Sequence, residues 1–150
     1  MSKKSIALLA LLIISPVIIY FLWPSDEARI KKLFREGTKA VEERNPEEVM
    51  SKVSYNYSDG HGLSYITLKQ AIERTFKEMS GIQVEYEIKG ITIREKSASA
   101  ELDLRIIATH GSDTGYALGD AARPAHLTFS LEKERTNWLV TKVEGLGVEY

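Results

Sequence analysis

The sequence predicts an α+β domain, with three helices packed on a curved antiparallel sheet of four or more strands, behind one N-terminal transmembrane helix. Three observations carry this prediction. Residues 6–23 are uncharged and almost entirely apolar, apolar residues recur at helical spacing within 26–79, and apolar and polar residues alternate from residue 82 onward. Helices followed by a run of strands are typical of domains in which the helices gather on one face of an antiparallel sheet.

The apolar stretch 6–23 follows Lys3 and Lys4 and is long enough to cross a bilayer. As a helix it extends about 27 Å, close to the ~30 Å hydrocarbon core. Cleavable signal peptides have shorter apolar regions and an Ala-x-Ala-like site, which the sequence lacks, and without any cysteine the chain cannot carry a lipid on that residue. We therefore expect an uncleaved signal anchor over 1–24 and a soluble domain over 25–150. A buried core helix is the alternative.

Positive charges flank this stretch on both sides. Two lysines precede it, and five basic residues follow it between Arg29 and Lys39. Charge counting weakens for segments beyond about 60 residues, so an N-terminal anchor can direct the whole domain across the membrane. We expect a single-pass membrane protein whose soluble domain is extracytoplasmic, as in a periplasm. That domain has 18 basic and 21 acidic residues, which argues against a nucleic-acid partner.

Three helices are predicted in the first half of the soluble domain. The first covers 26–44, because Ser25 is a suitable N-cap and two carboxylates follow it in the first turn. Asn45-Pro46 opens a short second helix. Thr67 and Gln70 form a capping box for a third helix, predicted over residues 67–79. The segment between the second and third helices is rich in turn-forming residues and tyrosine, with room for a minimal hairpin.

Alternation with a period of two predicts four strands in the second half. In the first strand the apolar phase shifts between Ile88 and Ile91, which predicts a bulge at Lys89-Gly90. A similar slip is expected before Val143 in the last strand. The predicted strands cover residues 82–93, 98–108, 125–131 and 138–143.

Residues 110–124 join the second and third predicted strands and are long for an antiparallel connection, where about 2 to 5 residues are usual. The glycines of this segment and its central Tyr116-Ala117-Leu118 suggest a mobile flap or a contact surface. The alternative is an extended arm that completes an edge of the sheet. Side chains of metal-ligand type lie around this loop, but their spacing fits no ligand pattern, so no metal and no cofactor is expected. They are His110, Asp113, Asp120 and His126.

The order of these elements is similar to that of a known fold. Two helices are followed by Ser54-x-x-Tyr57-x-Asp59, a third helix, and strands that close on Trp138-x-Val140. Residues 26–148 thus resemble the nuclear transport factor 2-like, or cystatin-like, superfamily, which includes the polyketide cyclase, ketosteroid isomerase and scytalone dehydratase folds. The resemblance implies a cone whose mouth lies between the bent sheet and the helices. Members bind small hydrophobic ligands, catalyse proton transfers, or serve as accessory or oligomerising domains, so the resemblance implies no particular reaction.

The periodicity of each helix and strand indicates which side chains point into the cone. The large side chains among these predict an apolar pocket there. Charged residues such as Glu101 and His126 fall on the opposite, solvent-facing side of the sheet. An unpaired carboxylate inside would cost several kcal/mol, so we expect no ionised group there. The candidate pocket residues are Phe34, Tyr57, Phe76, Tyr86, Leu104, Phe129 and Trp138.

Asp59 and His61 are the candidate polar site, because enzyme members of the superfamily place a polar cavity group before the third helix. Either would act as a base in a small-molecule isomerase, cyclase or hydrolase. The competing interpretation, which we favour, is an Asx-turn in which Asp59 accepts hydrogen bonds from nearby amides and the flanking glycines adopt positive φ.

The leading functional hypothesis is a non-catalytic, membrane-anchored domain that binds a partner protein or a small apolar ligand at the membrane surface. It rests on the anchor, the very short linker and the apolar inward pattern. The alternatives are the enzyme described above and an accessory subunit of a membrane complex. A homodimer through the convex sheet face is also expected, although Glu101, Asp103 and Arg105 make that face unusually charged for an interface.

Overall fold

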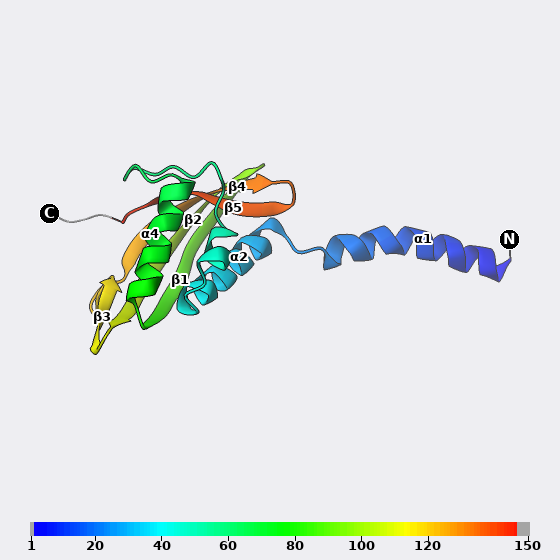
Figure 1. The fold of residues 1–150 in the computed structure, drawn as a ribbon. Helices are drawn as coiled ribbons and strands as arrows, with labels where there is room; N and C mark the ends of the chain where they lie inside the picture. Colours follow the sequence, from blue (N-terminus) through cyan, green and yellow to red (C-terminus); the bar gives the residue numbers. More distant parts are fainter. Residues whose placement is uncertain (1, 147–150) are drawn as a thin grey trace.

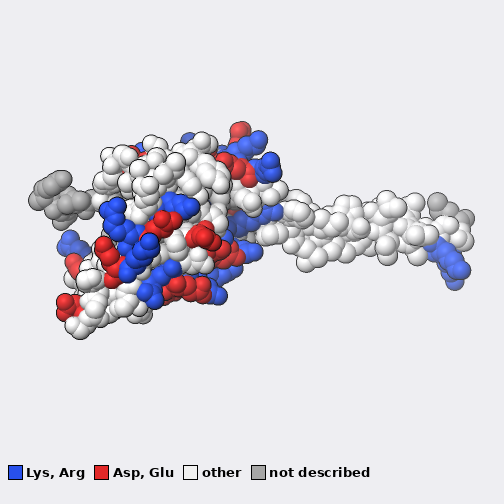
Figure 2. Space-filling view, viewed as in Figure 1, with Lys and Arg blue, Asp and Glu red and all other residues white. Residues whose placement is uncertain are grey.

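The computed structural model describes residues 2–146, which form an apolar helix followed by one α+β domain (Figure 1). The helix α1 (Lys3–Leu22) projects away from the domain. Its window Lys3–Tyr20 has a mean hydropathy of 1.8 and none of it is buried. Figure 2 shows the same helix as an uncharged rod with basic side chains at its far end. By length and composition α1 is therefore able to cross a membrane.

The helices α2 (Asp26–Glu42) and α3 (Pro46–Met50) begin where the sequence predicts. Ser25 is the N-cap of α2, and its hydroxyl accepts a hydrogen bond from the Ala28 amide at 3.1 Å. Asn45 caps α3 in the same way. One face of α2 packs on the sheet, because its apolar residues recur every three or four positions. The buried residues of α2 are Ile30, Leu33, Phe34 and Ala40.

The helix α4 (Tyr65–Glu78) starts earlier than predicted, and the predicted cap was wrong. Ser64 is the N-cap, and its backbone amide donates to the Thr67 hydroxyl at 2.7 Å. The Thr67 amide in turn approaches the Ser64 hydroxyl at 3.5 Å. Thr67 thus fills the third helical position of the capping box, where glutamate or glutamine is more usual. Serine and threonine both cap helices, so the pattern alone did not identify the first of the two as the cap.

The five strands form one antiparallel sheet in the order β1-β2-β4-β5, with β3 also paired to β2. The predicted bulge in β1 is confirmed, because the register shifts between Ile88 and Gly90. The predicted slip in β5 is confirmed as well, because Leu131 pairs with Val140 whereas the next pair is Ser130 with Lys142. The strands are β1 (Gly81–Arg94), β2 (Ser97–His110), β3 (Asp113–Leu118), β4 (Ala125–Glu134) and β5 (Asn137–Glu144).

The strand β3 lies within the segment 110–124 that the sequence left as a long connection. It pairs with β2 at Ile106–His110, on the edge of β2 that pairs with β4 over Ser97–Leu104. The segment is therefore, over β3, the extended arm that completes an edge of the sheet. Its polar, glycine-rich composition gives no alternating pattern from which a strand could be predicted.

The three helices of the domain cover one face of the sheet, which we call the inner face (Figure 1). The core lies between them and includes Ile30, Leu102 and Leu131, none of which is more than 1% exposed. The segment before α4 runs along the edge of β5, where the Ser54 amide donates to the Val140 carbonyl at 2.9 Å. The predicted minimal hairpin in this segment is present as a single bridge between Ser58 and Ser64.

Candidate functional site: an apolar cavity between the helices and the sheet

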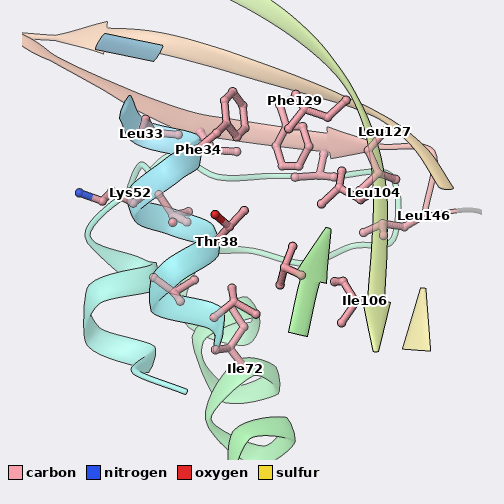
Figure 3. A pocket seen from close by; sticks show the side chains of 18 of the residues that line it. Leu33, Phe34, Thr38, Lys52, Ile72, Leu104, Ile106, Leu127, Phe129 and Leu146 are labelled. Carbon is pink, nitrogen blue, oxygen red and sulfur yellow. The ribbon is translucent and has the colours of Figure 1, made fainter. Parts of the chain in front are cut away.

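A cavity of about 320 Å³ lies between the helices and the inner face of the sheet (Figure 3). Small-molecule sites usually span about 300–1,000 Å³, so this volume lies at the lower end of that range. Its wall is built from α2, α3, α4 and all five strands. The wall is almost wholly apolar, with Leu33, Phe34, Ile72, Leu104, Ile106, Leu127, Phe129 and Leu146 among its side chains.

Strand geometry places the sheet side chains in this wall. Successive residues of a strand point to opposite faces, so Leu102, Leu104 and Ile106 of β2 share the inner face. In β5 the inward residues are Val140 and Val143, which are three positions apart. The extra residue of the β5 bulge lies between them and restores the inward phase.

Four of the seven predicted pocket residues line the cavity: Phe34, Tyr57, Leu104 and Phe129. The rings of Phe34 and Phe129 meet edge to face, with centroids 5.0 Å apart. They form the part of the cavity wall where α2 faces β4. Aromatic pairs of this geometry add stability beyond the area that they bury.

The other three predicted pocket residues lie outside the cavity wall. Trp138 is only 4% exposed, but its indole N–H donates to Asp26 Oδ1 at 3.1 Å, which holds the ring beside the start of α2. Tyr86 packs against the core further along β1 than the wall residue Val84. Phe76 lies one turn beyond Ile72 on α4.

The wall also contains residues that were not predicted for it. On α2, Leu33, Gly37 and Val41 follow one another at intervals of four, so helical spacing was a signal that could have placed all three together. Leu118 was missed because it belongs to β3, which has no alternating pattern. Leu146 was missed because it follows β5 and lies outside every predicted helix and strand.

Two side chains of the described wall carry ionisable groups, and neither ionisable group points into the cavity. The Tyr57 hydroxyl donates to Asp59 Oδ2 at 2.8 Å, and burial together with that carboxylate raises the pKa of Tyr57. The stem of Lys52 lines the wall, whereas Figure 3 shows its ammonium directed outward. Burial acts to lower the pKa of Lys52, but its ion pair with Glu36, at 2.7 Å, and the nearby Glu48 raise it.

Asp59 forms the Asx-turn that the sequence analysis favoured. Its Oδ1 accepts hydrogen bonds from the amides of His61, at 2.9 Å, and Leu63, at 3.1 Å, and Gly62 has a φ of +77°. Partial burial acts to raise the pKa of Asp59, but the hydrogen bonds from Tyr57 and the two amides outweigh it, so the pKa is lowered. A carboxylate stabilised in this way is a weak base. The His61 side chain is exposed, so neither residue presents a base to the cavity.

The side chains considered for a metal site do not come together. Within residues 2–146 no group of three or more histidine, cysteine, aspartate or glutamate side chains gathers where a metal ion could bind. Asp120 instead accepts hydrogen bonds from the amides of Ala122 and Arg123, at 2.8 and 2.7 Å. His126 pairs through Nδ1 with Asp103 Oδ1, at 2.7 Å, on the face of the sheet opposite the helices.

Comparison with known proteins identifies the fold as nuclear transport factor 2-like, or cystatin-like. No protein-family model and no curated protein matches the sequence. Among solved structures, a scytalone dehydratase-like protein from Novosphingobium aromaticivorans has a TM-score of 0.67 at 14% identity, over 77% of this chain and 78% of that one. A domain of unknown function with a cystatin-like fold from Nostoc punctiforme gives 0.63 at 16%, over 83% and 80%. An NTF-2 like protein of unknown function from Shewanella oneidensis gives 0.59 at 17%, over 79% and 97%.

Proposed function

We propose that this protein is a membrane-anchored, non-catalytic binding domain that holds a small apolar ligand in the cavity. The observation that carries the proposal is the composition of the wall, in which the described side chains turn hydrocarbon inward. Burying apolar surface is favourable by roughly 25 cal/mol per Å², and this wall offers little else to a ligand. The apolar helix α1 provides the anchor.

Catalysis of a proton transfer would need a base aimed at the substrate. Asp59 is engaged by three hydrogen bonds, His61 is exposed, and the Tyr57 hydroxyl points to Asp59 rather than into the cavity. These placements support binding over an isomerase, cyclase or hydrolase. A protein partner or a membrane complex would use the outside of the domain, so each remains compatible with a filled cavity.

Gly37 gives a sharp test, because it lines the cavity and has room for a side chain. A Cβ atom at this position would meet only the Lys52 Cγ, at 4.0 Å. Gly37→Leu places an isobutyl group in the cavity and obstructs it, whereas the control Gly37→Ala adds one methyl group and leaves most of it open. Since glycine inside a helix costs roughly 0.5–1 kcal/mol relative to alanine, the control is also expected to be more stable than wild type.

The measurement is thermal unfolding of the full chain in phosphatidylcholine nanodiscs with and without dodecanol, an uncharged apolar probe. A ligand at 100 times its Kd stabilises a protein by about 2.7 kcal/mol. We expect dodecanol to raise the Tm of wild type and of Gly37→Ala, and to leave that of Gly37→Leu unchanged. Equal shifts in all three proteins, or no shift in wild type, would contradict the proposal.

We also propose that the domain lies outside the cytoplasm, with α1 as a single membrane span. The two lysines that begin α1 and the length of the domain support this orientation. Protease added to cells with a permeabilised outer envelope should then degrade the domain and spare α1. Complete protection of the domain would place it in the cytoplasm instead.

A further inference from the structure

A second hollow adjoins the cavity on the side of α1. This groove, of about 610 Å³, lies between the end of α1, the first turns of α2, the end of α3 and the start of β5. Unlike the cavity it is partly polar, and its lining includes the charged side chains of Arg29, Lys32, Glu36 and Lys52. Three cations and one carboxylate therefore line it, which favours an anion.

The groove and the cavity share part of their walls. Leu33 and Lys52 line both. The Lys52 stem faces the cavity, and its ammonium is bound outside by Glu36 at 2.7 Å and by Glu48 at 3.5 Å. A molecule with its apolar part in the cavity therefore has a cation within reach at the boundary.

The ion pairs of Lys52 at this boundary can break at little cost in free energy. The Glu36 side chain is 40% exposed and that of Glu48 is 50% exposed, and partly exposed pairs of this kind contribute little to stability. Lys32 shares Glu36 with Lys52, at 3.7 Å, so one carboxylate serves two ammonium groups. Glu48 is a second partner of Lys52, so an incoming anion would take the place of Glu36 at one of the two lysines.

The groove also borders the apolar helix. Trp23 and Pro24, the residues directly after α1, form part of its lining. The Arg29 guanidinium lies 5.5 Å from the centre of the Trp23 ring and donates to the Thr136 carbonyl at 3.0 Å. Tryptophan is typical of the level of lipid headgroups, so the groove opens where a lipid headgroup would lie.

We propose that the ligand is a single-chain anionic amphiphile, with its tail in the cavity and its acidic head in the groove on Lys52 and Lys32. This inference rests on the proposed function and adds the chemical class of the ligand. An uncharged apolar molecule would fill the cavity and leave the groove unused. A two-chain lipid would need a second apolar site that the cavity, at about 320 Å³, does not offer.

The test compares dodecanoate with dodecanol on the full chain in phosphatidylcholine nanodiscs, by thermal unfolding. In wild type, dodecanoate should raise the Tm more than dodecanol does. Lys52→Met keeps the stem and removes the charge, so we expect its apparent affinity for dodecanoate to fall about tenfold or more while its affinity for dodecanol is kept. Lys32→Met should act in the same direction. The control Lys31→Met removes a neighbouring cation that pairs with Glu27 outside the groove, and should behave as wild type.

The outcomes separate the two proposals. Equal Tm shifts by dodecanoate and dodecanol in wild type, or a Lys52→Met variant that still favours dodecanoate as wild type does, would overturn the anionic head and leave the apolar cavity standing. If neither compound shifts the Tm, the proposed function itself fails. A dodecanoate shift that survives Gly37→Leu would place the tail outside the cavity and overturn this inference.

Discussion

The two faces of the sheet are built from the same strands and differ in almost every other respect. On the inner face Leu102 and Leu127 are 0% and 3% exposed and pair with each other across β2 and β4. One residue further along, on the outer face, Asp103 pairs with His126 in solvent, with side chains 22% and 54% exposed. The inner face carries the cavity, and the outer face carries cross-strand charge pairs.

The difference between the two faces indicates where the stability of this domain resides. Burial of an apolar side chain contributes about 1.5–3 kcal/mol, whereas an exposed ion pair contributes about 0–1 kcal/mol. The outer face is therefore free to vary in charge. The inner face must both hold the helices and leave a cavity unfilled, which limits how large its side chains can be.

The largest expected effect is a difference in stability between substitutions on the two faces of the sheet. Leu102→Ala should lower the free energy of unfolding by about 2–5 kcal/mol, because Leu102 is fully buried. Its neighbour Glu101 points outward, and Glu101→Ala should change the same quantity by no more than about 0.5 kcal/mol. Urea unfolding of both variants measures the difference. Similar losses in the two would mean that the assignment of the faces is wrong.

A smaller effect concerns pH at the end of the inner face. Hydrogen bonds from Lys133, at 2.9 Å, and from the Trp138 indole, at 3.1 Å, lower the pKa of Asp26 from its ordinary 3.8. The stabilisation is therefore present above that ordinary pKa and is lost as the pH falls through the lower, folded-state pKa. Asp26→Asn should lose less stability between pH 5 and acidic pH than wild type does, as measured by urea midpoints. Parallel curves for the two proteins would contradict this assignment.

The smallest expected effect on stability belongs to the outer face, where we propose the homodimer contact that the superfamily resemblance implies. Thr128→Arg places a bulky cation near the middle of this face and should leave the free energy of unfolding within about 0.5 kcal/mol of wild type. Sedimentation of the full chain in detergent should then show a dimer for wild type and a monomer for the variant. A wild-type monomer at high concentration would remove the dimer proposal.

Local signals in the sequence predicted most of the fold. The N-caps of α2 and α3, Ser25 and Asn45, were identified directly, and the bulges in β1 and β5 followed from shifts of the apolar phase. The start of α4 was misplaced because Ser64 and Thr67 are both capping residues. The strand β3 was missed because it is held by pairing with β2, a tertiary contact that the glycine-containing segment 110–124 does not signal.

The candidate site was harder to predict than the fold. The alternation of apolar and polar residues was sufficient to place Leu104 and Phe129 in the cavity wall, since it decides which face of the sheet a strand residue occupies. It was not sufficient for Trp138, whose position depends on a hydrogen bond to Asp26, far away in the sequence. The Lys52 stem was not predicted in the wall, because a lysine is expected at the surface and only its methylene groups are buried.

The shortness of the connection after α1 has a kinetic consequence. Only three residues, from Trp23 to Ser25, separate the end of α1 from the start of α2, and even fully extended they span about 10 Å. If α1 spans a membrane as we propose, a domain tethered so closely would sample one leaflet of one bilayer. Its encounters with an amphiphile would depend on the mole fraction of that molecule in the membrane rather than on its concentration in water, so diluting the vesicles would leave the uptake rate unchanged while diluting the amphiphile with inert lipid would slow it.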